Sequence, residues 1–353
     1  MQQVDVAVIG IGPAGSSAAI AAARKGVKVI AIDRRTTIGE PVQCGEIVPL
    51  GFAHERTIPH ELIVSRLRTM KTVFPSGRTI TTHAPGVMLD RSRFDRWLAE
   101  EAVRAGAVVC AGVRATGIDG HRIDCVGRFG HFSLNARFII GADGPRSLTA
   151  RAIGLDPLRC LRTAQCRVPL KKMSDAAEFM FRDAWRGGYA WLFPKQGFAN
   201  VGIGVPDGDP APLLTDLLAE LAASERIDPG AMAWMGGLVP IERRENPIHA
   251  HILLVGDAAG QTHPITGGGI PQAVIAGEAA GAAAGQAAQT NTPEALLEYP
   301  RAFDARFGTE LRRAAARRIE LDAAQEALES TLERCWVACR GYYGHAGSRP
   351  DDV

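Results

Sequence analysis

Apolar and polar residues at the start of the chain alternate in blocks that predict a strand, a helix and a second strand. Val4 to Ile9 is a short apolar run followed by glycine, which is typical of a strand buried in a parallel sheet. Ala14 to Lys25 is rich in alanine and precedes Gly26, as expected of a helix that ends at a glycine. Val27 to Ile32 predicts a second buried strand that ends at Asp33. Together these segments predict a βαβ unit.

The pattern changes near residue 65 and indicates antiparallel sheet. Ser65 to Phe74 and Arg78 to His83 flank the turn residues Pro75-Ser76-Gly77, which predicts a hairpin. Arg91 to Ala105 has its apolar residues on one face and predicts an amphipathic helix. Strands dominate again between Cys160 and Pro240.

A glycine-rich fingerprint opens the first predicted helix. Gly10-Ile11-Gly12-Pro13-Ala14-Gly15 matches G-x-G-x-x-G directly after a strand, where the second glycine lets the backbone approach a pyrophosphate. The helix N-terminus adds free N–H donors for the phosphates. Asp33 is placed to accept hydrogen bonds from a ribose, and it disfavours a 2′-phosphate there. NAD and FAD both remain open on this motif alone. The expected binding residues are Gly10, Gly12, Pro13, Ala14, Gly15, Asp33 and Arg34.

Two distant segments favour FAD over NAD. Gly256-Asp257 follows an apolar strand, so that the carboxylate of Asp257 is placed to bond a ribityl chain. Gly267-Gly268-Gly269 precedes a long predicted helix that starts at Ile270, which allows close backbone approach to an isoalloxazine ring. The dipole of that helix favours the negative charge of a reduced flavin. The predicted FAD site therefore includes these residues as well.

The fold class predicted from these segments is α/β. A Rossmann-type FAD-binding domain is interleaved with a mainly antiparallel β-sheet substrate domain and is followed by a C-terminal helical segment. The predicted boundaries are 1–62, 87–155 and 245–292 for the discontinuous FAD-binding domain, 63–86 and 156–244 for the substrate domain, and 293–353 for the C-terminal helices.

Composition excludes several classes of protein. Apolar residues make up 46% of the chain, enough for a sizeable core, and a net charge of +2 gives no basic field for nucleic acid. The seven cysteines include no Cys-x-x-Cys pair, which fits a reducing cytosol, and we expect no metal site. The run from Ile270 to Ala288 contains Glu278 and predicts a packed helix rather than a membrane span. We expect a cytoplasmic protein, with peripheral membrane contact left open.

The motifs resemble those of the flavoprotein superfamily that includes aromatic hydroxylases, flavin halogenases and geranylgeranyl reductases. Asp90-Arg91-Ser92-Arg93-Phe94-Asp95 resembles the arginine segment of that superfamily near the flavin. Gly141-Ala142-Asp143-Gly144 resembles its central Asp-Gly motif, which contacts FAD and, in hydroxylases, transient NADPH. The resemblance covers residues 4 to 290 and implies cofactor contacts at Arg91, Ala142, Asp143 and Gly144.

Within that superfamily the geranylgeranyl reductases fit best. Pro41-Val42-Gln43-Cys44-Gly45-Glu46 resembles their Cys-Gly segment, which implies that Cys44 and Gly45 lie beside the flavin. Tyr189-Ala190-Trp191-Leu192-Phe193-Pro194, followed by Gly202-Ile203-Gly204, resembles their substrate motif and implies substrate contacts at Tyr189, Trp191 and Phe193. The Trp-x-Trp-x-Ile-Pro sequence of tryptophan halogenases is not found. Fewer residues follow Gly269 than in longer members, which leaves a smaller or protein-borne substrate open.

Two of these features have more than one interpretation. Tyr189, Trp191 and Phe193 alternate along a strand, so their rings share one face that suits either an apolar ligand or ordinary sheet core. Free cysteines are usually buried and inert, whereas a thiol beside a flavin is able to donate a proton or form a transient adduct. Cys44 is therefore the candidate catalytic residue.

Three functions fit the sequence. The first is reduction of carbon–carbon double bonds in a geranylgeranyl-type prenyl lipid or another apolar substrate, with a hydride from reduced FAD and a proton from Cys44. No second Rossmann fingerprint is present, so the expected electron donor is transiently bound NADPH or a ferredoxin-like protein. The alternative is a flavin monooxygenase that hydroxylates an aromatic or other electron-rich substrate. The third is an electron-transfer flavoprotein, against which the aromatic motif argues.

Overall fold

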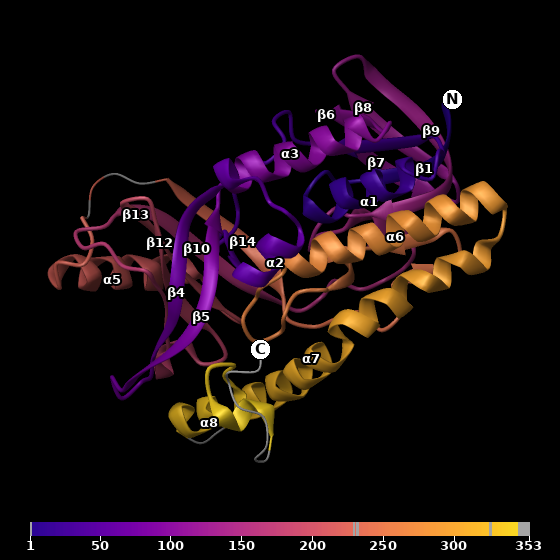
Figure 1. The fold of residues 1–353 in the computed structure, drawn as a ribbon. Coiled ribbons are helices and arrows are strands. Elements are labelled where there is room, and N and C mark those ends of the chain that lie inside the picture. The colour runs from indigo at the N-terminus through magenta and orange to yellow at the C-terminus, as the bar shows by residue number, and fades with distance from the viewer. Residues whose placement is uncertain (1, 229, 231–232, 325–326, 345–353) are drawn as a thin grey trace.

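The βαβ unit predicted at the start of the chain is present in the computed structural model, which describes residues 2–228, 230, 233–324 and 327–344 (Figure 1). The unit consists of β1 (Gln2–Ile9), α1 (Pro13–Ala23) and β2 (Val29–Asp33). The two strands are parallel, with Val6 paired to Val29. Their apolar residues, Val4 and Val6–Ile9 in β1 and Val29–Ile32 in β2, are buried, as the apolar runs predict.

The first of two sheets has the strand order β15-β16-β9-β1-β2-β6, in which the strands from β16 to β6 are all parallel. Its further strands are β6 (Val108–Ala111), β7 (Arg114–Asp119), β8 (Arg122–Gly127), β9 (Gly130–Gly141), β15 (Ile248–His249) and β16 (Ile252–Leu254). The start of β9 forms an antiparallel meander with β8 and β7, and its end pairs with β1 and β16. One continuous strand thus serves both parts of the sheet.

The second sheet has the order β14-β10-β13-β12-β11-β4-β5-β3. Its strands are β3 (Ile47–Pro49), β4 (Ile63–Val73), β5 (Thr79–Leu89), β10 (Cys160–Pro169), β11 (Ala176–Met180), β12 (Tyr189–Lys195), β13 (Phe198–Val205) and β14 (Trp234–Pro240). All neighbours are antiparallel except β4 and β11. The mixed α/β class is therefore confirmed, while the exact domain boundaries stay a prediction.

Two helices lie side by side along the first sheet, α1 and α6 (Ile270–Thr290) (Figure 1). Glycines permit the close contact: a Cβ on Gly277 would lie 2.1 Å from the carbonyl oxygen of Ala14. The helix is packed in the core, as its composition predicts, and Glu278 pairs with Arg56 at 2.8 Å. Among the described residues, no helix has both the length and the apolar character to cross a bilayer.

The remaining helices surround this core and extend to the second sheet. They are α2 (Leu50–Glu55), α3 (Arg91–Arg104), α4 (Leu148–Ala152), α5 (Pro210–Ala223), α7 (Glu298–Ala323) and α8 (Leu328–Cys335). The long helix α7 runs from the end of α6 back to the second sheet, where α8 packs (Figure 1). Directly after α8, the ring of Trp336 packs 5.0 Å from Phe179 and 4.8 Å from Phe181. The C-terminal segment therefore covers part of the second sheet.

Candidate active site

A cavity of about 740 Å³ lies at the carboxyl ends of the parallel strands of the first sheet. Its walls come from the segments that follow β1, β2, β9 and β16, together with the Cys44-Gly45 segment and the start of α6. In an open parallel sheet this edge is where ligands bind, because the strand ends and helix N-termini converge there.

Most of the predicted cofactor residues line this cavity. Those that line it are Gly10, Gly12, Pro13, Ala14, Asp33, Arg34, Cys44, Gly45, Arg91, Ala142, Asp143, Gly144, Gly256, Asp257, Gly267, Gly269 and Ile270. Gly15 and Gly268 do not line it. Gly15 is needed for packing instead, because a Cβ there would lie 1.8 Å from the carbonyl oxygen of Gly10.

The glycine turn after β1 is shaped to leave room for a ligand. A Cβ on Gly12 would meet no atom within 4 Å, although this residue lines the cavity and precedes the first residue of α1. The carboxylate of Asp33 holds the turn, since it accepts hydrogen bonds from the backbone N–H of Ile11 and of Arg35, both at 2.8 Å. The turn is thus fixed while its open side faces the cavity.

The cavity is also lined by three charged groups, Arg91, Asp95 and Asp257. Arg91 forms a bidentate ion pair with Asp95, with both N–O distances 3.0 Å, and this pair is nearly buried. Burial raises the pKa of Asp257 to about 6, and the positive charge of Arg91 partly opposes the rise. Asp257 therefore changes between hydrogen-bond acceptor and donor close to neutral pH.

Cys44 lies at the edge of the same cavity beside Arg91. Its Sγ accepts a hydrogen bond from the backbone N–H of Glu46 at 3.2 Å, and its carbonyl oxygen accepts one from Gln165 at 3.0 Å. Burial raises the pKa of the Cys44 thiol above its ordinary value, against the lowering effect of Arg91. This shift favours the protonated thiol over the thiolate.

A buried ion pair that the sequence did not reveal supports the Cys44 segment. The carboxylate of Glu46 accepts hydrogen bonds from Lys195 at 2.7 Å and from Asn200 at 2.8 Å. Its other oxygen accepts one from the backbone N–H of Arg91 at 3.0 Å. Glu46 belongs to the Cys-Gly-Glu motif, so the sequence shows where this acid lies. Its partners Lys195 and Asn200 are distant in sequence, so the sequence does not show that they pair with it.

The three aromatic residues of the substrate motif share one face of β12, as their alternation predicts, but none of them lines the cavity. They form a buried layer behind it. The Phe193 ring lies 2.9 Å from where a Cβ on Gly45 would stand, and Trp191 donates a hydrogen bond to Gln165 at 2.9 Å. The hydroxyl of Tyr189 donates to the carbonyl oxygen of Thr266. Substrate contact by these rings stays a prediction.

The loop before α6 is anchored by a second network that the sequence motifs did not reveal. Nδ1 of His263 accepts hydrogen bonds from the backbone N–H groups of Ile265 and Thr266, at 3.3 and 3.2 Å. Its Nε2 lies 3.3 Å from the carboxylate of Glu310, which also accepts a hydrogen bond from Tyr342 at 2.6 Å. This network joins the cavity wall to α7 and to the C-terminal segment.

Known proteins have similar sequences and structures. The family described as FAD dependent oxidoreductase matches residues 5–152. Digeranylgeranylglycerophospholipid reductase 2 of Methanopyrus kandleri is 33% identical over 94% of this chain and 90% of its own length. The digeranylgeranylglycerophospholipid reductase of Methanocaldococcus jannaschii is 33% identical over 93% of this chain and 91% of its own length.

This chain is also similar to solved structures of flavoproteins. A geranylgeranyl bacteriochlorophyll reductase-like protein from Thermoplasma acidophilum has a TM-score of 0.84 and 26% identity, covering 95% of this chain and 91% of its own. The fold and the cavity define an FAD-dependent oxidoreductase. Within that class, the chain belongs to the geranylgeranyl reductase family. A flavin-dependent brominase, with a TM-score of 0.72 and 17% identity over 91% of this chain and 88% of its own, shares the fold alone.

Proposed function

We propose that this chain reduces carbon–carbon double bonds of a geranylgeranyl-type isoprenoid lipid or another apolar substrate. The observation that carries the proposal is the position of Cys44, which lines the predicted FAD cavity beside Arg91. The names of the relatives, digeranylgeranylglycerophospholipid reductases, support the substrate class. The monooxygenase alternative has less support, because the halogenase-type neighbour shares only the fold.

The cavity residues fit FAD in both size and chemistry. We propose that the open turn at Gly12 receives the pyrophosphate, that Asp33 binds a ribose and that Asp257 binds the ribityl chain. Gly267 and Gly269 would let the backbone approach the isoalloxazine ring. When bound and reduced, FAD supplies the hydride for one alkene carbon.

We propose that Cys44 supplies the other hydrogen. Its thiol gives a proton to the second alkene carbon, so that the substrate gains one hydride and one proton in total. The thiolate left behind lies beside the guanidinium of Arg91, whose charge favours it until a proton returns from water. Asp95 positions Arg91 for this role through the bidentate pair. An isolated alkene is a poor electrophile, so the two transfers require a site from which water is excluded.

The aromatic layer supports an apolar substrate. Phe193 and Tyr189 lie behind the cavity-wall glycines Gly45 and Gly267, and we propose that these two rings and Trp191 border the path of the prenyl chain. The oxidised cofactor must then regain two electrons, which we propose come from transiently bound NADPH or from a ferredoxin-like protein. Because the proposed substrate is a membrane lipid, we also propose peripheral contact with the membrane surface.

An anaerobic single turnover tests this function. The purified protein is reduced with dithionite, excess reductant is removed, and geranylgeranyl diphosphate or a geranylgeranyl lipid is added while flavin absorbance is followed. We expect reoxidation without oxygen and a gain of two hydrogens per double bond by mass spectrometry. A flavin that stays reduced with every prenyl substrate, but consumes oxygen with an aromatic one, would establish the monooxygenase instead.

A further inference from the structure

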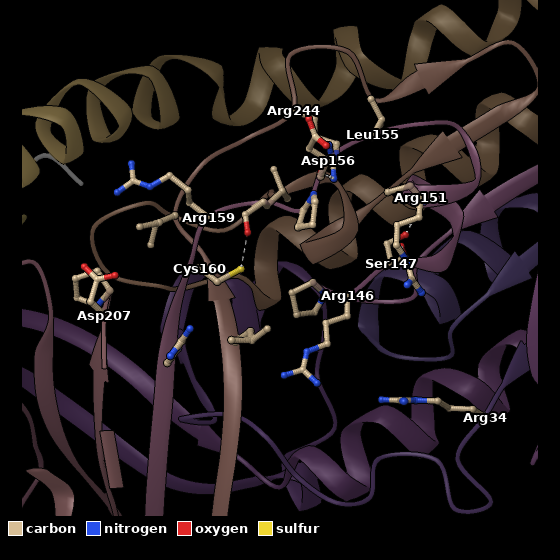
Figure 2. Close-up of a pocket in the computed structure, with 18 residues that line it drawn as sticks. Arg34, Arg146, Ser147, Arg151, Leu155, Asp156, Arg159, Cys160, Asp207 and Arg244 are labelled. Atoms are coloured by element: carbon tan, nitrogen blue, oxygen red, sulfur yellow. Dashed lines mark hydrogen bonds between the residues drawn. The ribbon is translucent and has the colours of Figure 1, made fainter. Parts of the chain in front are cut away.

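A second cavity, of about 680 Å³, adjoins the predicted FAD cavity (Figure 2). It lies between the end of β9 and the segment that leads into β10, with β14 on another side. The two cavities share part of their lining, including Arg34, Arg146 and Arg151. A molecule in the second cavity would therefore lie next to the cofactor.

The lining of this second cavity is strongly positive. Six arginines line it, and only two aspartates, Asp156 and Asp207, are among the other lining residues. The arginines are Arg34, Arg146, Arg151, Arg159, Arg162 and Arg244. Because a guanidinium group stays protonated at all physiological pH values, the lining carries an excess of four positive charges.

Few of these arginines are neutralised by the protein itself. Only Arg159 forms an ion pair in the described part of the chain, with Asp322 at 3.0 Å. Within the described ranges, Arg34 and Arg146 neither donate a hydrogen bond to another residue nor pair with a carboxylate, and both are exposed. Figure 2 shows both side chains extending into the open space of the cavity. Elsewhere, by contrast, Arg91 and Arg226 contact carboxylates directly.

We propose that this arginine-lined cavity binds a phosphorylated ligand other than FAD. Guanidinium groups match the oxygen geometry of phosphate, and each is able to donate two parallel hydrogen bonds. Like charges held around one cavity repel each other, and an anion with several charges relieves that repulsion better than a single carboxylate. The chemistry is therefore that of a phosphate monoester or a diphosphate.

Two ligands of the proposed reductase carry such groups. One is a nicotinamide dinucleotide phosphate that reduces the flavin, and the other is the phosphorylated headgroup of the prenyl lipid. That the ligand is one of these two molecules rests on the proposed function. That the cavity binds a phosphate group does not rest on it. Two small fragments separate the sources: adenosine 2′,5′-bisphosphate stands for the dinucleotide, and glycerol 1-phosphate stands for the headgroup.

The test is calorimetric titration of the FAD-loaded protein with inorganic pyrophosphate at low and high salt. We expect binding that weakens as salt increases, because the contacts are charged and accessible to water. Arg162→Gln alters a residue that lines only this cavity, and Arg146→Gln alters one of the arginines without a partner. Each is expected to weaken pyrophosphate binding by about tenfold or more, since a charge-assisted hydrogen bond contributes that much.

The matched control is Arg68→Gln, because Arg68 lines neither cavity and its side chain is 82% exposed. It should bind pyrophosphate as the unaltered protein does, and flavin absorbance should be unchanged in it and in Arg162→Gln, because neither residue lines the predicted FAD cavity. Displacement of pyrophosphate by either organic fragment supports the proposal, and the tighter one identifies the source. The proposal is overturned if the unaltered protein does not bind pyrophosphate, if both arginine variants bind it as well as Arg68→Gln does, or if neither fragment displaces it. A protein that binds the fragments but reduces no prenyl substrate would instead refute only the proposed function.

Discussion

The carboxylate of Glu46 and the ammonium of Lys195 are 2.7 Å apart, although the residues are 149 positions apart in sequence. Both side chains are almost inaccessible, with exposed fractions of 5% and 6%. The pair joins the Cys44-Gly45-Glu46 segment to β12, the strand that carries the aromatic layer. Removing one partner of a buried pair leaves the other charge without compensation, whereas removing both does not.

We therefore expect Lys195→Met to lower the free energy of unfolding by about 3–5 kcal/mol. The double variant Glu46→Gln with Lys195→Met should recover a substantial part of that loss. Denaturant titrations of the three proteins measure the effect. If Lys195→Met were as stable as the unaltered protein, water or another group would have to compensate the charge of Glu46.

The role of Cys44 as proton donor predicts a specific loss of activity. Cys44→Ala should slow the anaerobic reduction of a prenyl substrate by about 10²–10⁴-fold, the usual contribution of general acid catalysis. Flavin content should be unchanged. Cys110→Ala is the matched control, because Cys110 is also a free, partly buried cysteine but lies on β6 and does not line the cavity. Equal rates in the two variants would rule out Cys44 as the donor.

The raised pKa of Cys44 has its own chemical consequence. Only the thiolate reacts with iodoacetamide, so alkylation of Cys44 should be slow at neutral pH, and its rate should still be rising with pH at the ordinary pKa of 9.0. The rate is measured by mass spectrometry of the peptide that contains Cys44. Fast alkylation with a plateau near pH 7 would mean that Arg91 lowers the pKa of Cys44 by more than burial raises it.

Asp257 predicts a pH dependence of stability in the FAD-free protein. Its pKa rises from 3.8 to about 6 on folding, so the folded state binds more protons than the unfolded state between these values. The free energy of unfolding should therefore fall as pH rises through this window, by at most about 3 kcal/mol. Asp257→Asn should lack this contribution. An unchanged pH profile in that variant would assign the effect to other groups.

Two glycines predict opposite results on substitution. Gly12→Val should leave the fold intact, because a Cβ there meets no atom, yet should weaken FAD binding by at least about tenfold, or about 1.4 kcal/mol. Gly277→Val should destabilise the protein, because α1 leaves no space for a Cβ. Thermal unfolding and FAD titration separate these outcomes. If Gly12→Val bound FAD with normal affinity, the pyrophosphate would not bind at this turn.

Local patterns in the sequence predicted the elements and the cavity well. The βαβ unit, the β4–β5 hairpin and helix α6 each depend on neighbouring residues. The βαβ unit and the start of α6 supply part of the lining of the cavity. The period of β12 likewise predicted that its three aromatic rings share a face.

Relationships across the chain could not be predicted in this way. Strand period shows which side chains share a face but not what covers it, and Trp336 of the C-terminal segment packs against the Tyr189 ring. The same limit applies to the partners of Glu46 and to the arginines of the second cavity, which come from segments without any common motif. Only the tertiary structure brings such residues together.

The walls of the FAD cavity come from segments near residues 10, 33, 44, 91, 143 and 257. A cofactor bound there acts as a noncovalent cross-link between parts of the chain that are far apart in sequence. At a thousandfold excess over its dissociation constant, such a ligand adds about 4 kcal/mol to the free energy of unfolding. The supply of flavin in the cell would then set how long the chain survives proteolysis, so that the amount of this protein follows the availability of its own cofactor.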